Sequence, residues 1–331
     1  MDGFESLRVR SVERLTDDSV AITFDSSFTW RAGQHVTVRG PRDERRTYSI
    51  CAPVGGPLRI GVKRLDGGVV STWLCTAVSS GDVLDVLPPA GSFSPVVRPW
   101  RFGLVGAGSG ITPLLSIAAT LLAAGAEVLL LLGNRTTKEV MFLEDLGDLK
   151  DRYPTCLQVV HVLSREEQTS PLMSGRLDRE RLPVLLDAFA SGIESWYLCG
   201  PLDLVTTARE VLVQRGITDV HVELFHAGAP PARPPQLDDA REVTVHATLN
   251  GRTSVVATDR ATALLDAVLS VRADAPFACR GGVCGTCRAR LVDGKVELAV
   301  NWALEQSELD DGVILTCQAH ALTDEVRVTY L

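Results

Sequence analysis

The chain has 331 residues, of which 45% are hydrophobic and 22% charged, proportions typical of a folded globular protein rather than a disordered or fibrous one. At about 150 residues per domain, this length predicts two or three domains. The 41 acidic residues outnumber the 33 basic ones and leave a net charge of -8, which would repel nucleic-acid phosphates. A nucleic acid is therefore not expected as a partner.

The N-terminal residues are charged where a secretory signal would need an apolar stretch. We therefore expect a cytoplasmic protein. The charged positions are Asp2, Glu5, Arg8, Arg10, Glu13 and Arg14.

Residues 114–132 are almost wholly apolar and long enough to raise the possibility of a transmembrane helix. Gly110 and Pro113 stand at the head of this segment, Gly125 interrupts it, and Glu127 begins a new apolar run. A buried helix followed by a buried parallel strand explains the pattern better, so no membrane insertion is expected.

The first part of the chain, residues 1–98, predicts an antiparallel β-barrel. Short apolar runs alternate with Gly, Pro and Asp between residues 7 and 87. Runs of this kind occur at residues 36–38, 48–50 and 58–62.

The second part, residues 99–228, changes pattern: apolar strands alternate with helical segments, which is typical of a parallel α/β domain. The predicted strands are residues 102–105, 128–132, 157–163, 196–199 and 220–224. The predicted helices are residues 114–124, 179–190 and 204–214.

A linker is predicted at residues 229–240, where four prolines fall within residues 230–235 and exclude a packed element. After it, apolar residues alternate with polar ones from Val243 to Leu249. Asn250 and Gly251 then predict a tight hairpin turn. Residues 241–331 are therefore expected to form a third domain, rich in antiparallel strands.

Four of the eight cysteines lie in this third domain. Cys279, Cys284 and Cys287 have the spacing C-x4-C-x2-C, and Cys317 follows, which is the plant-type ferredoxin pattern for a 2Fe-2S cluster. The ligand loop is rich in glycine, so backbone N–H groups can approach the cluster sulfurs.

Two alternatives to the cluster are weaker. Zinc ribbons pair two C-x2-C knuckles, whereas this chain has one, and a disulfide framework does not suit a cytoplasmic protein. The scattered cysteines Cys51, Cys75 and Cys156 are expected to be small buried apolar residues.

Two motifs in the barrel region could bind a flavin. Arg46, Thr47, Tyr48 and Ser49 form the first, which alone could be an ordinary strand. In the second, Gly67 and Gly68 precede Val70, Ser71 and Thr72 at the start of a predicted helix. Such a helix N-terminus offers N–H groups to a pyrophosphate, although a plain capped helix would have the same pattern.

The second domain carries a glycine-rich turn between a strand and a helix, the context of a dinucleotide site. Its residues are Gly106, Gly108, Gly110, Thr112 and Pro113. Ile111 stands where the third glycine of G-x-G-x-x-G would be, so this motif alone is weak. Cys199, Gly200 and Pro201 close a later strand, where the thiol could be an ordinary buried one.

In chain order, R-x-Y-S, G-x-x-S-T, G-x-G-x-G-x-x-P and C-G-P are followed by the plant-type cysteine spacing. This ordered set resembles the ferredoxin-NADP reductase superfamily fused to a C-terminal ferredoxin, over nearly the whole chain. The resemblance implies an antiparallel β-barrel flavin domain, a parallel α/β nucleotide-binding domain and a β-grasp ferredoxin domain.

The resemblance also implies site residues. Ser49 would orient flavin N5, Cys199 would lie beside nicotinamide C4, and Glu223 belongs to a Glu-x-aromatic ending, beyond which this chain continues. These three are the implied catalytic residues. Flavin, as FAD, would be held by Arg46, Thr47, Tyr48, Ser49, Val62, Lys63, Val70, Ser71, Thr72 and Phe225. The nucleotide would be held by Gly106, Gly108, Gly110, Thr112, Pro113, Arg135, Ser164, Arg165, Cys199, Gly200 and Pro201.

The expected nucleotide is NADPH, with NADH as the alternative. An NAD site usually places an acidic residue at the end of the second strand, but Leu132 is followed there by Gly133, Asn134 and Arg135. Ser164 and Arg165 resemble a pair that clamps a 2′-phosphate in the superfamily, although the two arginines could simply be solvated.

Residues 294–305 and 315–318 carry a finer resemblance, to reductase components of ring-1,2-phenylacetyl-CoA epoxidases. The expected function is therefore to pass electrons from NADPH through FAD and the 2Fe-2S cluster to an oxygenase, favouring a diiron phenylacetyl-CoA epoxidase. Reductases of 3-ketosteroid 9α-hydroxylases share this layout. A Rieske or P450 oxygenase, or a redox sensor without steady turnover, is a further alternative.

An acidic run near the cluster domain could dock a basic partner surface, or could be a solvated face. It consists of Glu305, Glu308, Asp310 and Asp311.

Overall fold

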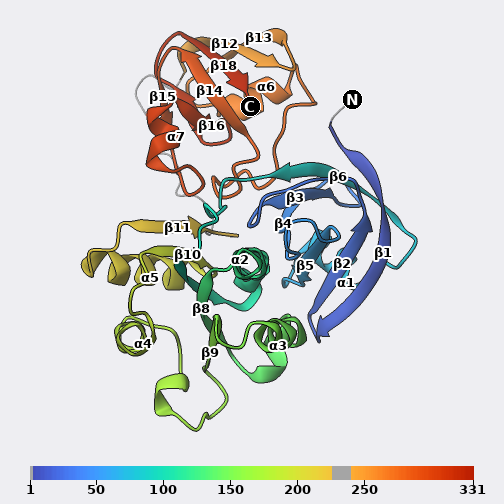
Figure 1. Ribbon diagram of the computed structural model, residues 1–331. Coiled ribbons are helices and arrows are strands. Elements are labelled where there is room, and N and C mark those ends of the chain that lie inside the picture. Colours follow the sequence, from blue (N-terminus) through green and yellow to red (C-terminus); the bar gives the residue numbers. More distant parts are fainter. Residues whose placement is uncertain (1–2, 226–239) are drawn as a thin grey trace. The chain divides into compact units, whose positions relative to one another are not determined.

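The computed structural model describes residues 3–225 and 240–331. Of these, residues 5–225 form one unit, and the C-terminal residues form another (Figure 1). The predicted linker, residues 229–240, lies outside the described residues except for its last position.

Six antiparallel strands build the first sheet, in the order β4-β3-β6-β1-β2-β5. An isolated bridge between Ile50 and Ile60 joins its two edges, which confirms the predicted barrel. The interior is filled by apolar side chains such as Phe24, Val36 and Leu74. The elements are β1 (Glu5–Thr16), β2 (Ser19–Asp25), β3 (His35–Arg39), β4 (Arg45–Ser49), β5 (Arg59–Lys63), α1 (Val69–Thr76) and β6 (Val83–Ala90).

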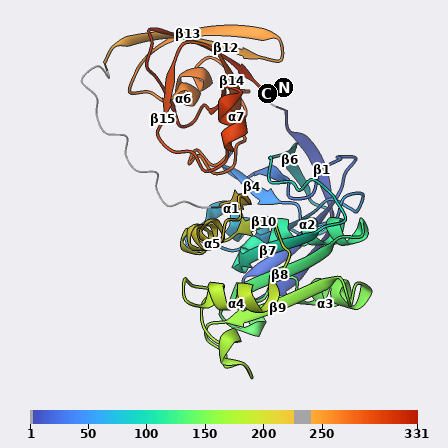
Figure 2. The ribbon, with the colours of Figure 1, turned by 60° about the vertical axis from the view of Figure 1, so that its left-hand side comes forward.

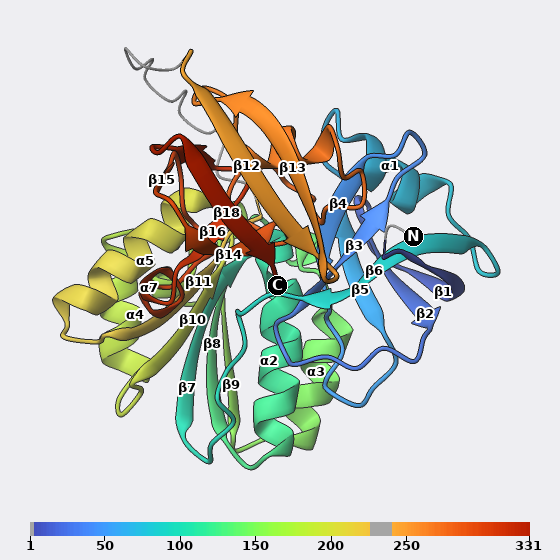
Figure 3. The ribbon, with the colours of Figure 1, turned by 90° about the horizontal axis from the view of Figure 1, so that it is seen from above.

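Five parallel strands form the second sheet, in the order β11-β10-β7-β8-β9. The strands are β7 (Arg101–Ala107), β8 (Glu127–Asn134), β9 (Leu157–Leu163), β10 (Ser195–Cys199) and β11 (Asp219–Glu223). The helices are α2 (Ile111–Ala123), α3 (Leu143–Arg152), α4 (Arg181–Phe189) and α5 (Leu202–Gln214). Helices α2 and α3 cover one face and α4 and α5 the other (Figure 3). The parallel α/β prediction is therefore confirmed.

The apolar segment 114–132 divides into most of α2 and the first part of β8, as predicted. Within the described residues, every helix is too short or too polar to cross a membrane. Several boundaries differ from the sequence expectations by up to three residues, and one helix of the parallel α/β domain was not expected. Strand β8 continues two residues past Leu132, and α3 was not predicted, because among its mostly charged residues only Leu146 is buried.

The barrel and the parallel sheet share one apolar core, to which the barrel region contributes Ala21 and Cys51 and the sheet contributes Leu104 and Leu130. Arg59 on β5 adds a polar link, since its guanidinium pairs with Asp145 on α3. A second guanidinium nitrogen of Arg59 lies 2.7 Å from Glu13 Oε2. These contacts explain why the two sheets form a single unit.

The C-terminal unit contains a mixed five-stranded sheet, in the order β13-β12-β18-β14-β16, with α6 packed against it (Figure 2). Strands β12 and β18 are parallel neighbours, as in a β-grasp fold. Asn250 and Gly251 have φ of 52° and 73°, the left-handed values that the predicted hairpin turn requires. Its elements are β12 (Glu242–Leu249), β13 (Arg252–Asp259), α6 (Leu264–Leu269), β14 (Arg288–Asp293), β15 (Val296–Leu298), α7 (Gln306–Asp310), β16 (Val313–Leu315), β17 (Ala319–Ala321) and β18 (Glu325–Tyr330).

Candidate functional site

The strand order of the parallel sheet reverses at β7 and β10, so a crevice is expected at the carboxyl ends of these two strands. From β7 the chain continues to β8 and β9 on one side, and β10 then returns to the other side of β7. Connections that leave neighbouring strands in opposite directions open a crevice at the strand ends, where open α/β sheets bind ligands. The glycine turn after β7 and the Cys199 turn after β10 both lie there.

The three glycines of the first turn have different roles. A Cβ on Gly110 would lie 2.1 Å from the carbonyl oxygen of Cys199, and one on Gly106 would lie 2.6 Å from Leu114 Cδ1. These two glycines allow the turn to pack against β10 and α2. Gly108 has φ of +55° with no atom within 4 Å of its Cβ position, so this is where a ligand could approach the backbone.

Of the other residues predicted for this crevice, some are buried or hydrogen-bonded within the protein and others are exposed to solvent. Thr112 is buried, and its hydroxyl donates to the carbonyl of Ser109 at 3.0 Å. Pro113 is buried within α2, whereas Pro201 is exposed where α5 begins. Gly200 has φ of +157° and marks the end of β10.

Three polar side chains from distant parts of the chain converge beside the barrel. Ser49 Oγ donates to Glu223 Oε2 at 3.2 Å, and His35 Nδ1 lies 3.8 Å from Glu223 Oε1. His35 stands opposite Ser49 in the β3–β4 register, so both side chains lie on the same face. His35 was missed by sequence reasoning, because a single histidine in an apolar strand has no motif and its neighbour is set only by strand register.

His35 is 4% exposed, and its Nε2 is buried without a hydrogen-bond partner. A buried polar atom without a partner is unfavourable. Its position beside Ser49 fits a bound polar group, such as a flavin ring, that would complete this cluster.

Cys199 lies opposite Glu223 in the parallel register of β10 and β11. Burial raises the pKa of the Cys199 thiol well above its usual value, and the nearby Glu223 carboxylate adds to this rise. The thiol is therefore neutral and suited to packing against a ring rather than to nucleophilic attack.

Strand β4 brings the predicted flavin residues to the end of the barrel. Burial raises the pKa of Tyr48 far above its usual value, so the phenol stays neutral. Arg46 is exposed and donates to the Arg45 carbonyl at 2.8 Å. Thr47 is half-buried.

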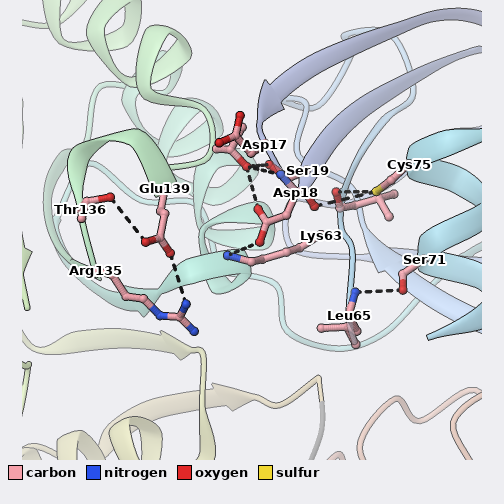
Figure 4. A network of polar contacts seen from close by, with 12 residues as sticks. Asp17, Asp18, Ser19, Lys63, Leu65, Ser71, Cys75, Arg135, Thr136 and Glu139 are labelled. Carbon is pink, nitrogen blue, oxygen red and sulfur yellow. Dashed lines mark hydrogen bonds and ion pairs between the residues drawn. The ribbon is translucent and has the colours of Figure 1, made fainter. Parts of the chain in front are cut away.

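Helix α1 begins at the position that the second flavin motif predicted. The side chains of Val70 and Ser71, however, make contacts within the barrel unit. Ser71 Oγ accepts from Leu65 N at 3.2 Å (Figure 4), and Val70 is buried. Thr72 is exposed. Any phosphate held here would therefore depend on the backbone N–H groups of the first helical turn and on Thr72.

Val62 and Lys63 on β5 are also engaged within the barrel. Val62 is fully buried, and Lys63 Nζ lies 3.4 Å from Asp18 Oδ2 (Figure 4). A cofactor contact at Val62 would therefore have to use its backbone. Phe225, the other predicted flavin residue, follows β11 and is 40% exposed.

The predicted 2′-phosphate residues meet beyond the ends of β8 and β9. Arg165 N donates to the carbonyl of Arg135 at 2.8 Å, which places these two exposed arginines side by side along the backbone. Ser164 N likewise donates to Asn134 O at 3.0 Å. Arg135 also lies 3.7 Å from Glu139 (Figure 4), so part of its charge is already balanced.

The four cysteine thiols of the C-terminal unit form two pairs. A hydrogen bond with Cys284 lowers the pKa of Cys279, and one with Cys287 lowers that of Cys317. Within the described chain, no group of three or more His, Cys, Asp or Glu side chains could hold a single metal ion. Two pairs of thiols therefore fit a two-iron cluster, with two ligands per iron, better than one zinc ion.

Hydrogen-bond donors surround these sulfurs. Gly281 N lies 3.4 Å from Cys279 Sγ, and Thr286 N lies 3.5 Å from Cys284 Sγ. Donors of this kind stabilise cluster thiolates. All four cysteines are free thiols.

The acidic run beside this site is partly structural. Glu305 and Glu308 form a reciprocal capping box at the start of α7, and Glu308 Oε1 lies 3.1 Å from Arg288 Nε. Asp310 accepts from Gln306 at 2.9 Å. These contacts account for three of the four carboxylates without a partner protein.

Comparisons with known proteins agree with this geometry. Residues 104–210 match the oxidoreductase NAD-binding domain, and residues 247–322 match the 2Fe-2S iron-sulfur cluster binding domain. The chain is 37% identical to a subunit of the 1,2-phenylacetyl-CoA epoxidase of Escherichia coli K12, covering 100% of this chain and 98% of that protein. It is 34% identical to the ferredoxin reductase component of 3-ketosteroid-9-alpha-monooxygenase from Rhodococcus rhodochrous, covering 98% and 96%.

The fold is also found in a solved structure, phthalate dioxygenase reductase. The TM-score is 0.63 at 24% identity, and the match covers 99% of this chain and 98% of that one.

Proposed function

Since the chain belongs to the ferredoxin-NADP reductase superfamily, in the group whose members end in a 2Fe-2S ferredoxin domain, we propose that it is the reductase component of a phenylacetyl-CoA epoxidase. Its cofactors are FAD, a pyridine nucleotide and a 2Fe-2S cluster. In this proposal, NADPH is the electron donor and the diiron oxygenase component is the acceptor. The observation that carries it is the 37% identity to a component of such an epoxidase over the whole chain.

A flavin supplies the conversion between the hydride of a nicotinamide, which carries two electrons, and an iron–sulfur cluster, which accepts one. The chain's own task is to bind, orient and exclude water. In the proposal, Arg46 and Thr72 hold flavin phosphates, Tyr48 packs against the ring, and Gly108 admits the nucleotide to the crevice after β7. Cys279, Cys284, Cys287 and Cys317 hold the cluster.

The overall oxidation of NADPH to NADP⁺ releases two electrons and one proton. The electrons leave through the cluster, so the proton needs an acceptor in the protein. Ser49 Oγ donates to Glu223 Oε2, so it can take up a proton while passing its own to the carboxylate. His35 Nδ1 lies 3.8 Å from the other carboxylate oxygen and so borders this acceptor without a direct hydrogen bond to it.

A second candidate destination is a 3-ketosteroid 9α-hydroxylase. Its support is the 34% identity to the reductase component of such an enzyme, again over nearly the whole chain. The proposed binding residues and the proton acceptor would be the same, and only the oxygenase would differ.

Reconstitution distinguishes the two candidates. The purified protein with both cofactors would be combined with NADPH and either the phenylacetyl-CoA epoxidase oxygenase or the ketosteroid oxygenase, and products would be measured by mass spectrometry. Epoxide formation well above steroid hydroxylation supports the proposal. Steroid hydroxylation without epoxide would overturn it, and capture of the oxygenase from native cells grown on phenylacetate gives an independent check.

A further inference from the structure

Gln318, directly after the fourth cluster cysteine, is 4% exposed and uses its side-chain amide near that ligand. Its Nε2 lies 2.8 Å from the Arg280 carbonyl oxygen and 3.0 Å from the Cys317 carbonyl oxygen. The same nitrogen lies 3.6 Å from Cys317 Sγ, within hydrogen-bond range for sulfur. A glutamine here therefore touches both the ligand sulfur and the C-x4-C loop.

The two carbonyl contacts determine which way the amide faces. Carbonyl oxygens only accept hydrogen bonds, so the NH₂ end must point toward Arg280 and Cys317, and the amide oxygen must point away. The N–H group that faces Cys317 is therefore shared between the carbonyl oxygen of Cys317 at 3.0 Å and its sulfur at 3.6 Å.

The backbone and packing leave this side chain little alternative. Gln318 N donates to Leu315 O at 2.9 Å, and Gln318 O accepts from Ala299 N at 2.9 Å. Its Cγ would lie 3.1 Å from a Cβ on Gly282, so the side chain runs across the ligand loop at a glycine. Backbone hydrogen bonds therefore hold Gln318 at its main chain, and the two carbonyl contacts hold it at its side-chain amide.

Arg280 adopts a left-handed φ of 54°, which is unfavourable for a residue with a Cβ. Its carbonyl is held by Gln318, and its guanidinium lies 2.7 Å from Asp266 Oδ1. Gln318 thus links the loop that carries Cys279 and Cys284 to the turn between β16 and β17 that carries Cys317.

We propose that Gln318 is a positioning residue that raises the reduction potential of the 2Fe-2S cluster. A reduced cluster carries one more negative charge than an oxidised one, so an N–H group directed at a ligand sulfur stabilises the reduced state more. Backbone N–H groups also face the ligand sulfurs, among them those of Gly281 and Thr286. Gln318 supplies a side-chain donor, which a substitution can remove. The inference rests on the 2Fe-2S assignment and not on which oxygenase receives the electrons.

The test is the substitution Gln318→Met, which keeps the approximate length and shape of the side chain but removes its N–H donor. The cluster potential of the full-length protein with FAD would be measured by EPR-monitored redox titration. We expect the affinity of the cluster for an electron to fall about tenfold, or about 59 mV for one electron. Gln306→Met is the matched control, since Gln306 is exposed on α7 and donates to Asp310, and it should leave the potential unchanged.

An unchanged potential in Gln318→Met, with iron and sulfide content equal to that of the parent protein, would overturn the proposal. If the variant fails to assemble its cluster, the proposal is tested on the parent protein instead, by pulsed EPR. Glutamine labelled with ¹⁵N at the side-chain amide should give a ¹⁵N hyperfine coupling in the pulsed EPR spectrum of the reduced cluster, and its absence would overturn the proposal. A parent protein without any cluster EPR signal would instead refute the 2Fe-2S assignment itself.

Discussion

In the proposed chemistry, the proton released from NADPH is accepted by a small set of residues, Ser49 and Glu223, with His35 beside them. Ser49 and Glu223 lie 174 positions apart in the chain and are joined by one hydrogen bond of 3.2 Å. Both are expected to act on the proton released when NADPH is oxidised. Their contribution can be separated from cofactor binding by measuring the FAD content of each variant beside its rate.

Ser49→Ala should slow NADPH-dependent reduction of ferricyanide by about a hundredfold, because it removes the group that passes a proton to Glu223. FAD and iron content should stay unchanged. Ser6→Ala is the control, since Ser6 on β1 also donates to a carboxylate, Asp85 Oδ1 at 2.8 Å, but on the surface. An unaltered rate in Ser49→Ala would contradict the proposed role.

A substitution of one residue, Arg165, tests the preference for NADPH over NADH. Arg165→Ala should raise the KM for NADPH about tenfold, since a charge-assisted contact to the 2′-phosphate is lost, and should change the KM for NADH little. Steady-state kinetics with both nucleotides give the answer. Arg209→Ala, an exposed arginine on α5, serves as the control. Equal effects on both nucleotides would refute the NADPH assignment.

At the scale of elements, the turn between β7 and α2 depends on close backbone packing. Gly110→Ala would place a methyl group 2.1 Å from the Cys199 carbonyl, so the turn or β10 must shift. We expect a loss of about 1–3 kcal/mol in unfolding free energy, seen as a lower Tm, together with weaker nucleotide binding.

The control for this substitution lies in α3. A Cβ on Gly147 meets no atom within 4 Å, so Gly147→Ala should stabilise the helix by about 0.5–1 kcal/mol. If Gly110→Ala proved as harmless as Gly147→Ala, the packing explanation of the glycine turn would be wrong.

Strand β9 adds a pH dependence to the stability of the parallel sheet. Burial lowers the pKa of His161, and its Nδ1 is buried without a partner. As the pH falls through the unfolded value near 6.5, the unfolded chain takes up a proton that the folded chain resists, so stability falls with pH. His161→Gln should therefore reduce the difference in Tm between pH 7.5 and pH 5.5. The same difference in both proteins would show that other groups cause it.

At the scale of the whole molecule, the redox groups are divided between two units. The four proposed cluster ligands lie within residues 279–317, whereas Ser49, Cys199 and Glu223 belong to the unit of residues 5–225. Each unit has its own apolar core. Loss of the cluster should therefore leave the flavin unit folded and active.

Cys317→Ala tests this division. The variant should lose the visible absorption and EPR signal of the cluster but keep its FAD and NADPH-dependent ferricyanide reduction, while electron delivery to an oxygenase should fall below detection. Cys156→Ala, a half-buried cysteine of the other unit, is the control and should retain the cluster. Loss of FAD together with the cluster in Cys317→Ala would contradict the independence of the two units.

The sequence by itself determined the fold class, most elements and the cofactor types. Alternation of strands and helices, the glycine turn, the hairpin at Asn250 and the C-x4-C-x2-C spacing are local patterns, because a few neighbouring residues suffice to favour each conformation or ligand set. Helix α3 was not predicted, because its residues are mainly charged and its apolar face is narrow.

Only the tertiary structure decided which residues meet. The approach of His35 and Ser49 to Glu223, the contact of Gln318 with the Arg280 loop, and the shared core of barrel and sheet all depend on strand order and register. A shift of register by one residue would turn His35, Ser49 or Glu223 to the opposite face of its sheet. Local sequence patterns predict that a strand forms, but not which partner strand it pairs with or in which register.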